Sequence, residues 1–164
     1  ISDEGEYVIN EVDSIVDVNE TIVLEEKYNL DELELLEVIE MGTDIEYQLY
    51  NNGLLIVSGS GATYDFNSDT ELYKYFKENL SCMTKNEVYK RWFHKVKYIL
   101  ILSDVTELGD YALSNLWYVE EISILPRLKK VGKKAFDSLG SHVKDTRWNA
   151  DFTETMSDET SFDK

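Results

Sequence analysis

Two stretches of the sequence decide the fold, because they repeat one pattern at a fixed spacing. Residues 96–116 read VKYILILSDVTELGDYALSNL, and residues 119–139 read VEEISILPRLKKVGKKAFDSL. The two stretches align without a gap at a period of 23 residues. The matched apolar or glycine pairs are Val96/Val119, Ile99/Ile122, Ile101/Ile124, Leu102/Leu125, Val105/Leu128, Leu108/Val131, Gly109/Gly132, Ala112/Ala135, Leu113/Phe136 and Leu116/Leu139. Such a match indicates two copies of one structural unit.

Each unit is expected to form a strand, a bend and a short helix. Ile99 and Ile101 alternate as in a half-buried strand. Gly109 suits a bend that needs a positive φ or a close approach of two backbones. Leu113 and Leu116 lie three residues apart, on one face of a helix. Neither unit can bury its apolar face alone, so we expect the two to stack as a short solenoid. The residues from 142 onward lack the strand pattern, so the repeats are expected to end near residue 140.

A β-hairpin is expected ahead of the repeats. Two β-rich runs, residues 45–50 and 54–58, flank the dipeptide Asn52-Gly53. This dipeptide is typical of the type I′ turn that joins hairpin strands. The hairpin is therefore predicted to cover the first repeat as an N-terminal cap.

Two helices are expected between the hairpin and the repeats. Residues 68–71 and residues 84–87 each have the pattern of a capping box, with Ser or Thr followed three positions later by Glu. Apolar residues follow each box at helical spacing; they are Leu72, Tyr75, Phe76 and Leu80, then Val88, Trp92, Phe93 and Val96. The predicted fold class is thus α+β, a two-repeat solenoid with a hairpin and helical cap over residues 44–140.

The two ends of the chain are acidic. The net charge is −17, and residues 1–46 hold 16 Asp/Glu and one Lys, whereas residues 74–147 hold 14 Lys/Arg and nine Asp/Glu. Residues 1–43 are predicted to be a separate acidic appendage with a short helix at 30–40. Val8, Val12, Ile15 and Val16 fit one helical face, but β-branched residues also favour a strand, so the fold of this part stays open. Residues 141–164 are expected to be a C-terminal cap or tail.

The combination of hairpin and repeats over residues 45–140 resembles the BspA-type leucine-rich repeats. The motif positions are Gly53, Leu55, Val57, Gly59 and Gly61 in the hairpin, then Gly109, Ala112 and Leu113, and Gly132, Ala135 and Phe136, in the repeats. Leu113 departs from the usual Phe, and segment 70–90 is longer than the family's spacer. The resemblance implies a curved solenoid of secreted or surface proteins of microbes, used for adhesion or protein binding. It implies no catalytic residue and no cofactor.

Composition excludes several classes of partner. A chain this acidic repels phosphate backbones and anionic membrane surfaces, so we expect no nucleic-acid partner and no membrane insertion. No apolar run approaches the ~20 residues that span a bilayer. No signal peptide is visible, so an extracellular or cell-surface location rests on the resemblance alone.

The residues of common catalytic and metal sites do not form their usual patterns. Cys82 is the single cysteine, and the two histidines form no zinc motif. Residues 65–69 imitate the start of an EF-hand loop, but Thr70 and Phe76 stand where Gly and Glu are required. Only a weak calcium site stays open there. We therefore predict no catalytic residue, no metal site and no enzyme activity, although an unrecognised carboxylate pair is an alternative.

Aromatic residues point instead to binding. Outward strand positions line the usual binding surface of a solenoid, and the link between the units is rich in aromatic side chains. The candidate binding residues are Tyr98, Leu100, Trp117, Tyr118, Glu121 and Ser123. The expected function is a protein-binding or adhesive module. The alternatives are a carbohydrate-binding module that uses exposed aromatics, and a purely structural cap or spacer.

Overall fold

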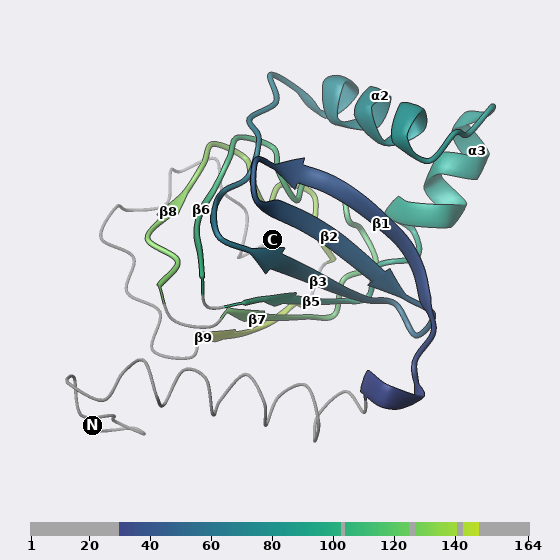
Figure 1. The fold of residues 1–164 in the computed structure, drawn as a ribbon. Helices are drawn as coiled ribbons and strands as arrows, with labels where there is room; N and C mark the ends of the chain where they lie inside the picture. The colour runs from purple at the N-terminus through teal and green to yellow at the C-terminus, as the bar shows by residue number, and fades with distance from the viewer. Residues whose placement is uncertain (1–29, 103, 125–126, 141–142, 148–164) are drawn as a thin grey trace.

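The computed structural model describes residues 30–102, 104–124, 127–140 and 143–147, which form two sheets and two α-helices (Figure 1). The six-stranded sheet has the order β1-β2-β3-β5-β7-β9, and the three-stranded sheet has the order β4-β6-β8. The strands are β1 (Leu35–Gly42), β2 (Ile45–Tyr50), β3 (Leu54–Gly59), β4 (Gly61–Ala62), β5 (Tyr98–Ile101), β6 (Val105–Leu108), β7 (Glu121–Ile124), β8 (Lys130–Val131) and β9 (Lys144–Arg147). The helical segments are the 3-10 turn η3 (Leu30–Glu32), α2 (Asp69–Asn79), α3 (Lys85–Val88) and the π-helix η4 (Tyr89–Phe93).

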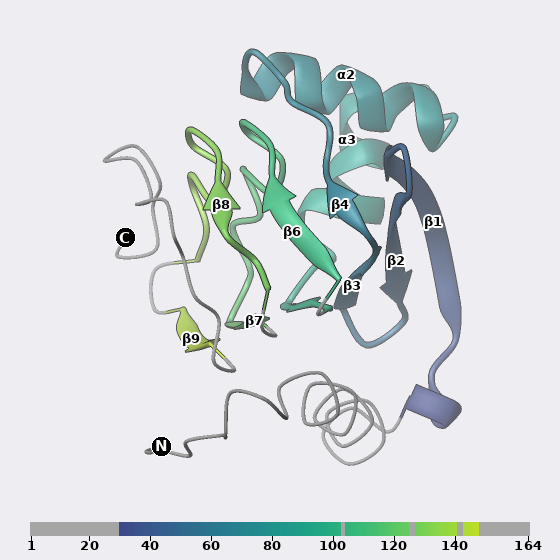
Figure 2. The same cartoon turned by 60° about the vertical axis from the view of Figure 1, so that its left-hand side comes forward.

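The six-stranded sheet changes from antiparallel to parallel pairing at β3. Strands β1, β2 and β3 form an antiparallel meander, and β3, β5, β7 and β9 pair in parallel. Figure 2 shows β4, β6 and β8 side by side as the second sheet, with α2 and α3 beyond the end of β4. The main core extends from Ile39 in β1 to Leu139 after β8.

The two predicted units lie side by side in register. Tyr98 of β5 pairs with Glu121 of β7, and Glu107 of β6 pairs with Lys130 of β8. Both pairs are one 23-residue period apart, as the alignment requires. The pairing explains the spacing, because parallel strands need a connection that returns each unit to its starting edge.

The strand pattern continues one period further than expected. Glu121 of β7 pairs with Lys144 of β9, again 23 residues away, so the expectation that it ends near Gly140 is wrong. The sequence KDTR of β9 has no apolar alternation to reveal it. Backbone pairing forms this strand, and it removes β7 from the edge of the sheet.

The short helix expected in each unit is wrong, because both segments are turns. Two residues of each turn segment adopt a left-handed backbone, and they recur at the repeat period: Tyr111 (φ 63°) and Asn115 (φ 70°), then Lys134 (φ 54°) and Ser138 (φ 59°). Left-handed residues end a right-handed helix. The first turn donates its amides to the second: Tyr111 N to Lys133 O (3.0 Å), Leu113 N to Ala135 O (2.8 Å) and Asn115 N to Asp137 O (2.8 Å).

The repeated glycines allow close backbone approach, which was one of the two expected roles. A Cβ at Gly132 would lie 2.6 Å from the amide nitrogen of Asp110, and a Cβ at Gly109 would meet the carbonyl oxygen of Tyr64. Each glycine therefore lets one turn layer pack on the layer before it.

The hairpin of β2 and β3 is confirmed, but its turn is of another kind. Gly53 has a φ of 92°, whereas Asn52 is not among the residues with a positive φ, and a type I′ turn needs both. The amide of Gly53 donates to the carbonyl of Tyr50 over 2.9 Å, and Asn52 Oδ1 accepts from Leu54 N at 3.0 Å. The three-residue loop thus ends in a left-handed glycine, which is the next most common hairpin design.

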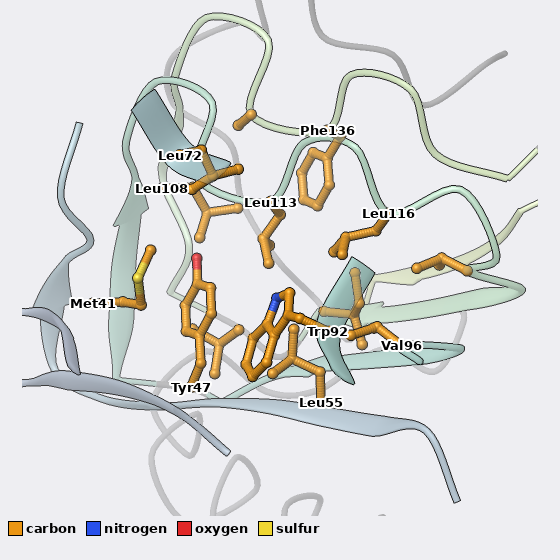
Figure 3. Packing of buried hydrophobic residues seen from close by; sticks show 14 of the residues in the cluster. Met41, Tyr47, Leu55, Leu72, Trp92, Val96, Leu108, Leu113, Leu116 and Phe136 are labelled. Carbon is orange, nitrogen blue, oxygen red and sulfur yellow. The ribbon is translucent and has the colours of Figure 1, made fainter. Parts of the chain in front are cut away.

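Both predicted helix caps are present. Ser68 Oγ accepts from Glu71 N, and Thr84 forms a full capping box with Glu87. The apolar residues predicted after the two boxes, including Phe76 and Trp92, are buried, except that Tyr75 is half-buried. Their rings stack with centroids 4.7 Å apart. Figure 3 shows Trp92 beside Tyr47, whose hydroxyl donates to the carbonyl of Ala112 at 2.8 Å and so joins the hairpin to the first repeat turn.

The acidic helix predicted at residues 30–40 is wrong. Only the 3-10 turn η3 forms, and the chain then enters the sheet as β1, ahead of the expected boundary at residue 43. Alternating burial of Ile39 and Met41 explains the strand, because a period of two buries both side chains on one face. The rest of the predicted appendage, residues 1–29, and the end of the tail, residues 148–164, lie outside the described residues.

Candidate interaction surface

The fold brings four of the six candidate residues together on one sheet face. Tyr98 and Glu121 are neighbours across β5 and β7, as are Leu100 and Ser123. Their side chains lie on the face opposite the main core, because Ile99 and the other alternate residues of these strands belong to that core. The sequence thus predicts the grouping of these residues.

The exposure expected for this face is wrong at two positions. Leu100 and Ser123 are fully buried, whereas Tyr98 and Glu121 are half-buried. Strand β3 places Leu54 and Ile56 beside Leu100 in an apolar cluster on this face. We call the cluster of Leu54, Ile56 and Leu100 the outer-face cluster. The side chains of this cluster are buried, so the cluster presents no exposed apolar patch.

The other two candidates form a separate, exposed aromatic group. The exposed fractions are 54% for Trp117 and 52% for Tyr118. Both rings lie around His94, with centroid distances of 6.5 Å from Trp117 and 4.8 Å from Tyr118. We call these three residues the turn aromatic cluster. They precede β5 and β7, at the end where the two parallel strands begin.

Neighbouring polar groups hold the turn aromatic cluster in place. Asn115 Oδ1 accepts a hydrogen bond of 2.5 Å from Trp117 Nε1, and Asn115 Nδ2 lies 3.4 Å from the hydroxyl of Tyr89. The Tyr89 ring in turn packs edge-on against His94 at 5.0 Å. Asn115 is one of the left-handed turn residues, a conformation that asparagine tolerates better than most residues. The rings are therefore anchored by the repeat turn.

Sequence reasoning missed His94, although the repeat contains a signal for it. His94 and Trp117 are 23 residues apart, one full period, and each stands two residues before a matched valine. Extending the alignment upstream by two residues would have placed the two side by side. Asn115 and Tyr89 have no comparable signal, because they meet only through the packing of η4 on the turn.

The acidic residues considered for calcium act as hydrogen-bond acceptors. Asp65 Oδ1 accepts from the amide of Asp110, and Asp69 Oδ1 accepts from the hydroxyl of Ser114, both at 2.7 Å. Within the described ranges, no group of three or more metal-binding side chains is found. The buried polar side chains there are Thr63, Ser114 and Ser123, so a buried carboxylate pair is not among them.

No helix in the described part of the chain combines the length and apolarity needed to cross a membrane.

Comparison with known proteins shows similarity at the level of the fold. No family model matches the sequence, and no curated protein matches it. The structure is similar to the crystal structure of a leucine-rich repeat protein from Eubacterium ventriosum ATCC 27560, with a TM-score of 0.53 and 15% sequence identity. The match covers 68% of this chain and 26% of that chain. The chain thus has a mixed α and β fold of leucine-rich-repeat type and spans about a quarter of that protein.

Proposed function

We propose that the chain is a non-catalytic protein-interaction module, a short BspA-type leucine-rich-repeat solenoid of a secreted or cell-surface microbial protein. The turn aromatic cluster is its contact surface. The parallel pairing of β5, β7 and β9 at a 23-residue period supports the solenoid architecture. The leucine-rich-repeat fold of the structural neighbour supports an interaction role.

One observation carries the proposal: two large aromatic side chains are half exposed and yet held in place. Tryptophan and tyrosine are enriched among the residues that dominate protein–protein binding energy. Anchoring by Asn115 reduces the entropy that Trp117 loses when a partner binds. Exposed apolar rings without such anchoring occur on many surfaces, so the anchoring is the informative feature.

The ring geometry favours a protein partner over a carbohydrate. The planes of Trp117 and Tyr118 are tilted by 44° and 51°, respectively, from the plane of His94. A sugar ring stacks on a flat platform, and neither ring continues the plane of the histidine. A folded surface or loop with apolar side chains fits a tilted group of rings better.

The experiment compares the unmodified chain with the double variant Trp117→Ser/Tyr118→Ser. The control is Met83→Ser, which removes an apolar side chain that is 81% exposed and lies outside the cluster. Immobilised proteins are incubated with a lysate and culture supernatant of the source organism, and the retained proteins are quantified by mass spectrometry. Equal thermal melting of the three proteins confirms equal folding.

The proposal expects a partner that the unmodified chain and Met83→Ser retain and that the double variant loses by tenfold or more, about 1.4 kcal/mol or above. If all three proteins retain a partner equally, the contact surface for that partner lies outside the turn aromatic cluster. A glycan array provides the second arm. Glycan binding that depends on Trp117, without a protein partner, would replace the proposal with the carbohydrate-binding alternative.

A further inference from the structure

The outer-face cluster is more deeply buried than the elements around it explain. Leu54 and Leu100 have no exposed surface, and Ile56 is 2% exposed. The partly buried residues packed against them are Leu33, Tyr50, Tyr98 and Leu102. All of these except Leu33 belong to the sheet itself or to the residue directly after β5. Among the described hydrophobic residues packed against the cluster, Leu33 alone comes from a segment ahead of the sheet.

The sequences of β3 and β5 are typical of strands that are buried on both faces. Strand β3 begins LLIV and β5 reads YILI, continuous apolar runs instead of an apolar and polar alternation. Such runs are typical of strands covered on both sides. The main core covers one side through residues such as Leu55 and Ile99. The other side needs an apolar cover of comparable extent.

The chain upstream of Leu33 is placed to supply that cover. Leu33 lies between η3 and β1, and Figure 1 shows η3, in purple, beside the start of β1 at the edge of the larger sheet. The 29 residues that precede η3 contain Val8, Val12, Ile15 and Val16 at the spacing of one helical face. The segment also contains nine acidic residues, which suit a solvated face.

We propose that residues 1–29 dock on the outer-face cluster of the same chain through the apolar stripe of Val8, Val12, Ile15 and Val16. Residues 1–29, here called the acidic head, then occupy from within the same chain the strand face that repeat proteins of this kind use for binding. The docking closes this face to external partners and leaves the turn aromatic cluster as the open surface. It does not depend on the function proposed above, because the two surfaces are separate.

A thiol reporter on the outer face tests the docking in the full-length chain. Ser123 is fully buried and pairs with Leu100 across β5 and β7, so Ser123→Cys places a small thiol beside the cluster. Its alkylation by iodoacetamide is followed by mass spectrometry. Cys82 is buried in the main core and serves as the internal control, because it is alkylated only when that core opens.

The reporter is combined with changes in the head that add equal charge to opposite faces. Val12→Asp/Ile15→Asp disrupts the apolar stripe, and Asn10→Asp/Ser14→Asp adds the same charge on the side away from the stripe when the segment is helical. If Cys82 also becomes reactive in Val12→Asp/Ile15→Asp, the main core has opened, and the milder variant Val12→Ser/Ile15→Ser is used instead.

The proposal expects alkylation at position 123 to accelerate on the order of tenfold in the stripe variants, with the rate at Cys82 unchanged. The charge control should label as slowly as the parent. Equal rates for stripe variants and control would overturn the proposal. Protection that rises with protein concentration would also overturn it, because a second copy would then be the occupant.

Discussion

At the scale of single residues, two buried serines differ in how their hydroxyl groups are satisfied. Ser114 and Ser123 are both fully buried. Ser114 Oγ donates to Asp69 Oδ1 over 2.7 Å and thereby connects the first repeat turn to α2. The hydroxyl of Ser123 has no hydrogen-bond partner within the described part of the chain. A buried polar group without a partner costs stability, whereas a satisfied one contributes to it.

We therefore expect opposite effects from the same substitution at these two positions. Ser123→Ala should raise the free energy of unfolding by about 1 kcal/mol, because it removes an unsatisfied hydroxyl. Ser114→Ala should lower it by about 1–2 kcal/mol, because it removes a bond to a carboxylate. Urea denaturation followed by circular dichroism measures both values. Destabilisation by Ser123→Ala would mean that residues outside the described ranges bind this hydroxyl.

At the scale of elements, the start of α3 is fixed by one carboxylate. Glu87 Oε1 accepts from the amides of Met83 at 2.7 Å and Thr84 at 3.0 Å, and Thr84 Oγ1 accepts from the amide of Glu87. The hydrogen bonds from the Met83 and Thr84 amides lower the pKa of Glu87, and the Arg91 charge adds to the shift. The carboxylate form is therefore favoured by the folded helix.

The lowered pKa makes this cap dependent on pH. A carboxylate with a lowered folded-state pKa stabilises the protein above its unfolded value of 4.5, and the contribution is lost as the pH falls through the folded value. Glu87→Gln should thus destabilise the chain at pH 7 and lose its effect as the pH is lowered below about 4.5. Chemical denaturation at a series of pH values measures the difference, with the exposed Glu78→Gln as the control. A difference that stays constant from pH 7 to pH 3 would contradict the role of the charge.

The caps and the hairpin strands could be predicted because their signals are local. The box at Thr84 and Glu87, and the β-rich runs on either side of Gly53, each specify an element within a few residues. Strand β9 could not be predicted, because its polar residues are ordered by pairing with β7. The turns at Asn115 and Ser138 could not be predicted either, because only a weak sequence signal marks a left-handed backbone at residues other than glycine.

The candidate surface was predicted only in part for a similar reason. The grouping of Tyr98 with Glu121 follows from the repeat period, which is visible in the sequence. The burial of Leu100 does not follow, because it depends on residues far away in the chain, among them Leu54 and Ile56 of β3. Exposure is a property of the packed molecule, and a repeat pattern specifies only which side chains share a face.

At the scale of the whole molecule, the hairpin, the helices and both repeat units share one core. A single cluster of buried side chains includes Tyr47 of the hairpin, Phe76 of α2, Trp92 of η4 and Phe136 of the second unit. Long solenoids unfold segment by segment when each repeat contacts only its neighbours. Because the cap is packed into the same cluster as the second unit, the two should unfold as one cooperative body.

Phe136→Ala, in the second repeat unit, tests whether the cap and the second unit unfold together. Phe136 is fully buried, so the truncation should lower the free energy of unfolding by about 3–5 kcal/mol. Trp92 is buried in η4, in the cap part of the same core, and its fluorescence reports unfolding of the cap once Trp117 and Trp148 are replaced by Phe. Because one cluster joins the cap to the second unit, the guanidinium midpoint of Trp92 should fall together with that of far-ultraviolet circular dichroism. A Trp92 midpoint that stays at the parent value, while the dichroism midpoint falls, would show that the second unit unfolds separately from the cap.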